Sequence, residues 1–299
     1  MSPNGQGRQR QGIPLLVRFI PIAIALVVML IYMNTAEEFE NPETGERSRV
    51  ALSLDQEATL GLQAFQQILQ SSRVLTSGPE VELIEHVAER LIAVVDPESK
   101  EFPWQVAVID DPQQNAFCLP GGKIAVYTGI LPICKNPDGL ATVMAHEIAH
   151  ATSRHGARRV FDSNALQIAL GGVQGSLAGM EPEQQRIVVG LLGAGAQYGV
   201  MLPFSRKHEL EADSIGIIYM ARAGFDPRES VEFWQRMGEA AQGQKPPEML
   251  STHPADQTRI ANLQRLMPEA LQIYRETLQL NQTESPPLEI GPSREELFR

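Results

Sequence analysis

The sequence has few cysteines and few aromatic residues. Two cysteines in 299 residues exclude a disulfide-dense scaffold and a zinc module built from cysteine alone. An aromatic content of 6% beside a hydrophobic content of 43% leaves Ala, Leu, Val and Ile as most of the apolar residues. This composition excludes a globally disordered chain and favours helices over a β-sandwich.

Basic residues are also scarce over most of the chain. Of the 25 Lys and Arg residues, Arg8, Arg10 and Arg18 lie within residues 1–36, which contain no acid. The remaining 263 residues therefore have 22 basic and 36 acidic side chains, a net charge of −14. Phosphate contacts need clustered Lys and Arg, so the acidic body argues against nucleic acid as a partner.

One long apolar run lies near the amino terminus. Residues 19–33 carry no charge, but as a helix they span only roughly 22 Å of a hydrocarbon core that is roughly 30 Å thick. Counting from Ile13 gives 21 residues, enough to span if the Arg18 side chain extends to the headgroups. Because arginines precede the run and acids follow it, we expect residues 1–36 to form a cytoplasmic tail and membrane anchor, with the body on the extracytoplasmic, periplasmic side.

A cleaved signal peptide is the alternative for this segment, and it would release the body into the periplasm. Asn34-Thr35-Ala36 matches a small-residue cleavage site poorly. The sequence therefore favours an uncleaved anchor.

The rest of the chain divides by composition into three parts. Residues 37–50 are polar and predict a stalk, residues 51–280 predict a folded domain, and residues 281–299 predict a disordered tail because they contain three Pro and four Glu. Within the domain, residues 163–203 are apolar and rich in Gly and Ala. We expect this insertion to form a helical hairpin or lid.

Periodicity predicts the secondary structure of the domain. Apolar residues at helical spacing indicate helices, and short runs rich in β-branched and aromatic residues indicate strands. The predicted strands are Trp104–Ile109 and Lys123–Thr128, separated by a turn-rich stretch over 111–122. The predicted helices are Gln56–Leu69, Pro79–Val95, a helix that Asp138 caps and that runs to about Gly156, Arg206–Ala223, Pro227–Gln242, Ala255–Leu266 and Pro268–Leu280.

Residues 146–150 read His-Glu-Ile-Ala-His and carry the chemistry of the domain. On a helix, His146 and His150 lie one turn apart on the same face, so both can bind one metal ion. Glu147 can then point toward the open side of the metal and accept a proton from water. Without further support, two partly exposed histidines on an amphipathic helix would be an alternative interpretation.

An acidic segment downstream supports the metal site. A catalytic zinc takes three protein ligands and keeps one open position. Glu209 can be the third ligand, and Asp213, one turn later, can accept a hydrogen bond from the non-metal nitrogen of a ligand histidine. Alone, this stretch could be a solvated acidic helix face. With the histidine pair, it predicts one Zn²⁺ per chain.

At this point the sequence resembles a known family. Residues 146–150 and Ser205–Asp213 (SRKHELEAD) are similar to the membrane-associated zinc metallopeptidases that include HtpX, the CAAX prenyl proteases, the mitochondrial Oma-type protease, BepA and LoiP. The similarity covers roughly residues 50–270 and includes further segments: 115–117 (NAF), 119–124 (LPGGKI), 127–131 (YTGIL), His155 with Arg158, and 251–254 (STHP) with Arg259-Ile260. It is strongest to the LoiP and BepA envelope group, although the chain lacks room for the repeat domain of BepA and has no lipoprotein cysteine like that of LoiP.

The resemblance implies a fold and an activity. The fold would be α+β and mainly helical, a zincin-type, gluzincin-like metallopeptidase with a small β-sheet, preceded by one membrane helix. The activity would be zinc-dependent hydrolysis of peptide bonds in unfolded or membrane-associated envelope proteins, in protein quality control. His146, His150 and Glu209 would bind zinc, Glu147 would be the general base and acid, and Asp213 would support a ligand.

Other residue roles also follow from the resemblance. Asn115 would lie beside the substrate, and the strand over 123–128 could be the sheet edge that pairs with the substrate backbone. His253 could approach the zinc, where it would stabilise the oxyanion or occupy the open position and keep the enzyme latent.

The remaining histidines and the cysteines have weaker signals. We expect His155 to lie on the helix surface or beside a ligand, His208 to point away from the face of Glu209, and His86 to be structural. A disulfide between Cys118 and Cys134 is permitted in an extracytoplasmic body, but it requires the chain to double back, and the sequence leaves this open.

Two other functions compete with proteolysis. An envelope chaperone or assembly factor could use a latent zinc-protease fold to hold its partners, although the presence of Glu147 argues against a purely non-catalytic protein. Prenyl-protein processing is disfavoured because the sequence lacks the multi-span membrane chamber that this reaction implies.

Overall fold

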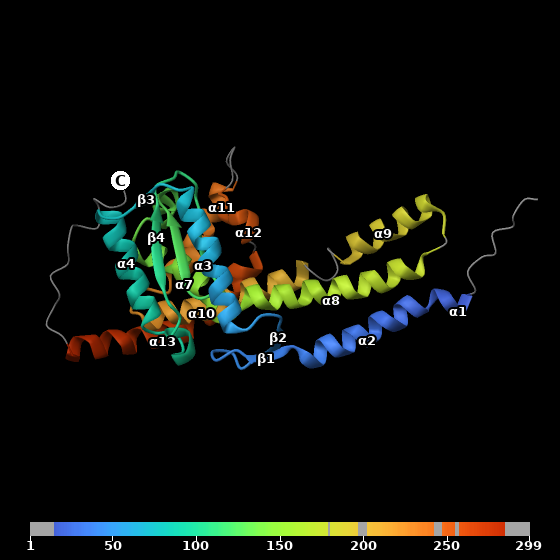
Figure 1. The fold of residues 1–299 in the computed structure, drawn as a ribbon. Coiled ribbons are helices and arrows are strands. Elements are labelled where there is room, and N and C mark those ends of the chain that lie inside the picture. Colours follow the sequence, from blue (N-terminus) through green and yellow to red (C-terminus); the bar gives the residue numbers. More distant parts are fainter. Residues whose placement is uncertain (1–14, 179, 197–201, 242–246, 255–256, 285–299) are drawn as a thin grey trace, which may run out of the picture. The chain divides into compact units, whose positions relative to one another are not determined.

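The computed structural model describes residues 15–178, 180–196, 202–241, 247–254 and 257–284 (Figure 1). These residues are mainly helical with a small sheet, as the sequence predicts. The chain divides into two compact units. One contains residues 1–37 and 159–204, and the other contains residues 38–158 and 205–299. We call the first the apolar unit and the second the catalytic unit.

A four-stranded sheet organises the catalytic unit (Figure 1). Its strands are β3 (Val74–Leu75), β4 (Gln105–Ile109), β5 (Ala116–Leu119) and β6 (Lys123–Tyr127), in the order β3-β4-β6-β5. The β4 and β6 strands are parallel, and both outer pairs are antiparallel. Alternating side chains of β4 and β6 point to opposite faces of the sheet, which lets one set of helices pack on each face.

Helices cover both faces of the sheet. On one face, Ala107, Ile109 and Ala125 pack against Phe65 of α3 (Leu54–Gln70). On the other face, Val108, Ile124 and Val126 join the main core with α4 (Pro79–Ile92) and α7 (Pro137–Thr152). The predicted apolar face of α4 is buried through Val81, Ile84, Val87, Ala88 and Leu91.

The strand order corrects one expectation about the substrate edge. Lys123–Tyr127 is an inner strand with β4 on one side and β5 on the other, so it cannot be the edge that pairs with a substrate. The edge strands are β3 and β5, and β5, which pairs with β6, lies inside the stretch that the sequence indicated as turn-rich. Lys123 is buried at the start of β6 and donates hydrogen bonds to the carbonyl oxygens of Pro103 and Gly121.

The metal-binding motif lies on α7, which is buried almost all around. Its amino terminus is capped by Asn136, whose side chain accepts a hydrogen bond from the Gly139 amide, and not by Asp138 as we expected. The helix ends at Thr152 and not near Gly156. Arg154 has a φ of 52°, a left-handed conformation that breaks the helix before α8 (His155–Ser176) begins.

The carboxyl-terminal half of the catalytic unit is helical. Its elements are α10 (Leu202–Arg222), α11 (Glu229–Ala240), α12 (Met249–Thr252) and α13 (Gln257–Glu284). The two helices that the sequence predicts over 255–266 and 268–280 form the single helix α13, which continues through Pro268. Leu263 and Ala270, on either side of this proline, are buried in the core. Residues 281–284 of the predicted disordered tail belong to α13, and residues 285–299 lie outside the described residues.

Three short elements complete the catalytic unit. The helix α5 (Pro97–Lys100) precedes β4, and α6 (Leu131–Cys134) follows a 3₁₀ turn after β6. Cys118 on β5 and Cys134 on α6 are both free, so no disulfide joins them.

Residues 37–50 form a β-hairpin, where we expected a polar stalk. The strands β1 (Glu37–Glu40) and β2 (Arg47–Val50) pair with each other, and Phe39, Asn41 and Val50 are buried. Val50 and Phe39 pack against Ala157 of the catalytic unit. The segment looks polar in sequence because only these few side chains are buried.

The apolar unit contains α1 (Leu15–Arg18), α2 (Ile20–Thr35), most of α8 and α9 (Pro182–Ala196). The Tyr32 ring of α2 stacks on Phe161 of α8 with 4.9 Å between the ring centroids. A Cβ added to Gly172 of α8 would lie 2.4 Å from the Cβ of Ala25. The two helices therefore pack closely because α8 has glycine at this contact.

Large apolar side chains are exposed over much of the apolar unit. No residue of α2 is buried, and Leu26 and Leu30 are 65% and 63% exposed. On α9, Leu191 is 70% exposed. None of the helices in the described residues combines the length and the apolar run that crossing a bilayer requires. Ile13 and Pro14, which the predicted anchor includes, lie outside the described residues.

Candidate metal centre

Two helices meet at the centre of the catalytic unit. A Cβ added to Gly216 of α10 would lie 3.2 Å from the backbone nitrogen of His146 on α7. A larger side chain at this position would push the helices apart. The absence of a side chain therefore brings the acidic residues of α10 beside the histidines of α7.

Four side chains converge at this contact. His146, His150, Glu209 and His253 each offer one ligand atom, and these atoms lie within 4.8 Å of one another. His150 Nε2 is 3.1 Å from His146 Nε2, and Glu209 Oε2 is 3.3 Å from His146 Nε2. Two imidazole nitrogens and a carboxylate form a donor set that suits zinc. The residues therefore fit a bound metal ion, which they can surround at close range.

His146 is held by Asp213, one turn after Glu209 on α10. Asp213 Oδ1 is 3.0 Å from His146 Nδ1, the nitrogen that faces away from the cluster. Burial and the charge of Arg259 lower the pKa of His146, but its hydrogen bonds with Asp213 and Glu209 outweigh both and raise the pKa to about 9. Because metal ligands must be unprotonated, a metal ion has to displace a proton here.

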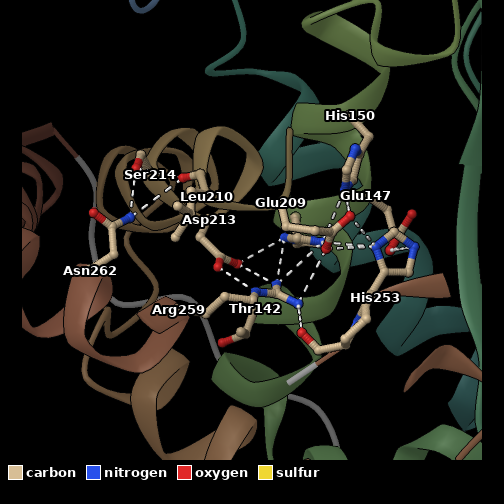
Figure 2. A network of polar contacts seen from close by, with 12 residues as sticks. Thr142, Glu147, His150, Glu209, Leu210, Asp213, Ser214, His253, Arg259 and Asn262 are labelled. Carbon is tan, nitrogen blue, oxygen red and sulfur yellow. Dashed lines mark hydrogen bonds and ion pairs between the residues drawn. The ribbon is translucent and has the colours of Figure 1, made fainter. Parts of the chain in front are cut away.

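Arg259 neutralises the buried carboxylates. Its Nε and Nη2 each donate to Asp213 at 2.6 Å, and its Nη1 lies 3.2 Å from Glu209 Oε2 (Figure 2). Its guanidinium carbon lies 3.6 Å from the centre of the Trp234 ring. Burial raises the pKa of Asp213. The charge and hydrogen bonds of Arg259 lower this pKa by more, so the net shift is downward. Arg259 thus keeps Asp213 ionised beside His146.

His150 has a different partner. Its Nδ1 lies 2.7 Å from Nδ1 of His155, and His155 Nε2 lies 3.2 Å from Glu211 Oε2. Burial lowers the pKa of both rings well below its usual value, so both are neutral at ordinary pH. His155 is therefore buried beside a candidate ligand and not on the helix surface. His208 is also buried, and its ring stacks on His155 with 4.4 Å between centroids.

Glu147 lies beside His253, the fourth member of the cluster (Figure 2). His253 Nδ1 is 3.0 Å from Glu209 Oε2 and 3.3 Å from His146 Nε2, and its Nε2 is 3.5 Å from Glu147 Oε1. Glu147 is buried, and among the described residues no side chain or backbone group hydrogen-bonds to its Oε1.

The β5 edge runs past this site. The negative charge of Glu147 adds to burial in raising the pKa of the Cys118 thiol on β5. Asn115 immediately precedes β5, and its side chain accepts a hydrogen bond from the Ala116 amide. No hydrogen bond links Asn115 to the cluster in the part of the chain that the structure describes. His86 lies on the exposed surface of α4.

Sequence reasoning missed the roles of two residues at the site. Arg259 was part of the motif that follows His253, but its partner Asp213 lies 46 residues away. Glu211 lies in the acidic segment between Glu209 and Asp213, and its spacing of two residues from each gives no sign of a role at the site. The signal that identifies Glu211 is the burial of the whole segment. No local sequence pattern predicts that burial.

Comparison with known proteins agrees with this geometry. The model of Peptidase family M48 matches residues 79–267, which is more than half of the chain. The chain belongs to peptidase family M48. This confirms the resemblance seen in the sequence, and with the relatives below it identifies the protein as a metalloendopeptidase.

Relatives of two kinds are similar to this M48 peptidase. The mitochondrial metalloendopeptidase OMA1 of Schizosaccharomyces pombe is 38% identical over 83% of this chain and 71% of its own length. OMA1 of Saccharomyces cerevisiae is 34% identical over 78% of this chain and 70% of its own length. The beta-barrel assembly-enhancing protease of Escherichia coli is 31% identical over 74% of this chain, which spans 46% of that protein.

We predict that Arg259→Met destabilises the metal-free protein by about 3–5 kcal/mol, because it leaves the buried Asp213 carboxylate without its cation. Urea unfolding in the presence of a chelator, followed by circular dichroism, measures this free energy. Arg265→Met on the same helix is the control, since Arg265 is exposed. Equal unfolding free energies for the two variants would contradict the role of Arg259.

Proposed function

We propose that the M48 peptidase binds one Zn²⁺ per chain through His146, His150 and Glu209. The observation that carries the proposal is the convergence of these three donors beside a buried carboxylate, Glu147, whose Oε1 has no hydrogen-bond partner among the described residues. When bound, zinc supplies a Lewis acid that polarises a carbonyl and makes water acidic near neutral pH.

Glu147 transfers the proton in this proposal. It accepts a proton from the attacking water and donates it to the leaving amine of the cleaved peptide bond. Asp213 holds the His146 ring by its Nδ1, so that Nε2 faces the metal position. Arg259 keeps Asp213 charged while it does so.

The substrate backbone is proposed to lie along β5. This strand is the free edge of the sheet beside β6, and its residue Cys118 lies within electrostatic range of Glu147. An extended peptide that adds to a sheet edge is bound by main-chain hydrogen bonds, which tolerate many sequences. Asn115, at the start of β5, is then beside the substrate. Such binding suits polypeptides that are unfolded.

His253 is proposed to control access to the metal. Its Nδ1 lies among the ligand atoms of His146, His150 and Glu209, so His253 would be a further donor to a bound zinc. In that position it keeps the enzyme latent, and after it swings away it can stabilise the developing oxyanion. The same observation favours a second function, in which the latent protein acts mainly as an envelope chaperone or assembly factor.

The apolar unit is proposed to associate with a membrane. Its exposed leucines, isoleucines and valines on α2 and α9 support contact with lipid, and the early arginines favour an amino terminus in the cytoplasm. The catalytic unit then acts on the extracytoplasmic side, on unfolded or membrane-associated proteins. The names of the relatives, one mitochondrial and one tied to β-barrel assembly, agree with a role in quality control of membrane or envelope proteins.

Glu147→Gln should lower peptidase activity by about 10²–10⁴-fold, because the amide cannot accept the proton of water. Casein degradation measures the activity, and metal analysis should show that zinc content is unchanged. Glu239→Gln on the exposed surface of α11 is the control. Casein degradation by the Glu147→Gln variant at the normal rate would reject this mechanism.

His253→Ala should change peptidase activity clearly, upward if the ring mainly blocks the metal and downward if it mainly stabilises the oxyanion. Casein degradation at equal zinc content measures the change. Ser251→Ala in the preceding turn is the control, because the Ser251 hydroxyl bonds only to Glu248 among the described residues. Unchanged kinetics for His253→Ala would rule out a role at the metal.

Leu26→Asp combined with Leu30→Asp should release the protein from membranes. Each charge in an apolar helix opposes insertion by about 2.5–3.5 kcal/mol. Sodium carbonate extraction of membranes, followed by immunoblotting of pellet and supernatant, measures the release. Leu60→Asp, on a leucine of α3 in the catalytic unit that is 50% exposed, is the control and should stay in the pellet.

A further inference from the structure

The two histidines of the His-Glu-Ile-Ala-His motif are supported in different ways. His146 contacts a carboxylate directly through Nδ1, whereas the Nδ1 of His150 contacts another histidine. His150 Nε2 faces the metal cluster at 3.1 Å from His146 Nε2 and 3.4 Å from Glu209 Oε1. The hydrogen on the His150 ring therefore belongs on Nδ1 if Nε2 is to offer its lone pair to a metal.

Glu211 determines where the hydrogens of this arrangement lie. Glu211 Oε2 already accepts a hydrogen bond from Arg158 Nη1, so it is also the acceptor for His155 Nε2 at 3.2 Å, and Nε2 carries the hydrogen. A neutral His155 then has a bare Nδ1, which accepts a hydrogen bond from the Nδ1–H of His150 at 2.7 Å. The Glu211 carboxylate therefore sets the direction of both hydrogen bonds, the one from His155 to Glu211 and the one from His150 to His155.

Two donors fix that carboxylate from the other side. Arg158 Nη1 donates to Glu211 Oε2 at 2.8 Å, and Asn41 Nδ2 donates to Glu211 Oε1 at 2.8 Å. Glu211, Arg158 and Asn41 are all buried. The Arg158 guanidinium and the Asn41 amide nitrogen can only donate, so both oxygens of Glu211 act as hydrogen-bond acceptors.

Asn41 comes from the amino-terminal hairpin, and its orientation is set there. Its Oδ1 accepts from the Glu43 amide at 2.9 Å within the turn, which leaves Nδ2 free to point at Glu211. The same Nδ2 lies 3.0 Å from Ser153 Oγ in the break between α7 and α8. The hairpin thus ties the carboxylate to the end of the helix that bears His150.

We propose that Glu211 and His155 form a hydrogen-bonded relay that positions His150 as a metal ligand, and that Asn41 and Arg158 hold Glu211 in place. The proposal rests on the proposed zinc site. The relay also predicts which ring nitrogens of His150 and His155 carry hydrogen in the metal-free protein. His155 and Glu211 are positioning residues, since they act only through His150.

Substitutions of His155 separate this role from simple packing. In His155→Asn, the amide oxygen takes the place of Nδ1 and still accepts from His150, whereas His155→Leu fills a similar volume with no acceptor. We expect His155→Leu to lower zinc affinity by about 10–100-fold and His155→Asn to retain most of it. Competition with a chromophoric chelator on the full chain measures affinity, with His86→Leu on the exposed surface of α4 as control.

Nitrogen-15 NMR of the histidines in the metal-free full chain provides the second readout. The relay predicts hydrogen on Nδ1 of His150 and on Nε2 of His155, and loss of the single His150 tautomer in His155→Leu. Equal zinc affinities for the Leu and Asn variants would overturn the proposal. So would a His150 ring with hydrogen on Nε2 beside a doubly protonated His155. If the wild-type chain bound no zinc, the proposed function would fail, while the NMR pattern would still decide on the relay.

Discussion

The burial of imidazoles and carboxylates side by side is the constraint on which the rest of the structure depends. Each ring nitrogen that does not face the metal position needs a hydrogen-bond partner, and each buried carboxylate needs a compensating charge. Asp213 is the hydrogen-bond partner of the His146 Nδ1 nitrogen, and Arg259 is the compensating charge for Asp213. The catalytic unit repeats this pattern on its other side, where Arg158 compensates a carboxylate.

The α10 helix supplies all the carboxylates in this arrangement except Glu147. Glu209, Glu211 and Asp213 follow one another at intervals of two residues, so Glu211 points to a different side of the helix from the other two. This spacing lets one helix reach the metal cluster and His155 at once. It works only because α10 lies against α7 at Gly216, where the helices approach closely. A shift of one helix along the other would separate every carboxylate from its histidine.

Much of this site could be predicted from sequence because its first elements are local. His146 and His150 lie one helical turn apart, and Glu209 and Asp213 repeat that spacing, so each pair has a common face without any knowledge of the fold. The apolar periodicity of α4 and the β-branched runs of β4 and β6 are local in the same sense. The strand order is not local, and β5 was missed because four residues between turn-forming prolines and glycines have no clear alternation. That omission placed the substrate edge on the wrong strand.

The partners that complete the site could not be predicted, because their contacts join residues far apart in sequence. Asn41 meets Glu211 across 170 positions, and nothing in the polar segment around Asn41 distinguishes it from a solvated stalk. A hairpin that buries only a few side chains has the composition of a linker, although its buried amide lies against the support of a candidate ligand. Local patterns show which residues can bind a metal. Which nitrogen each histidine offers depends on buried neighbours that only the folded chain brings together.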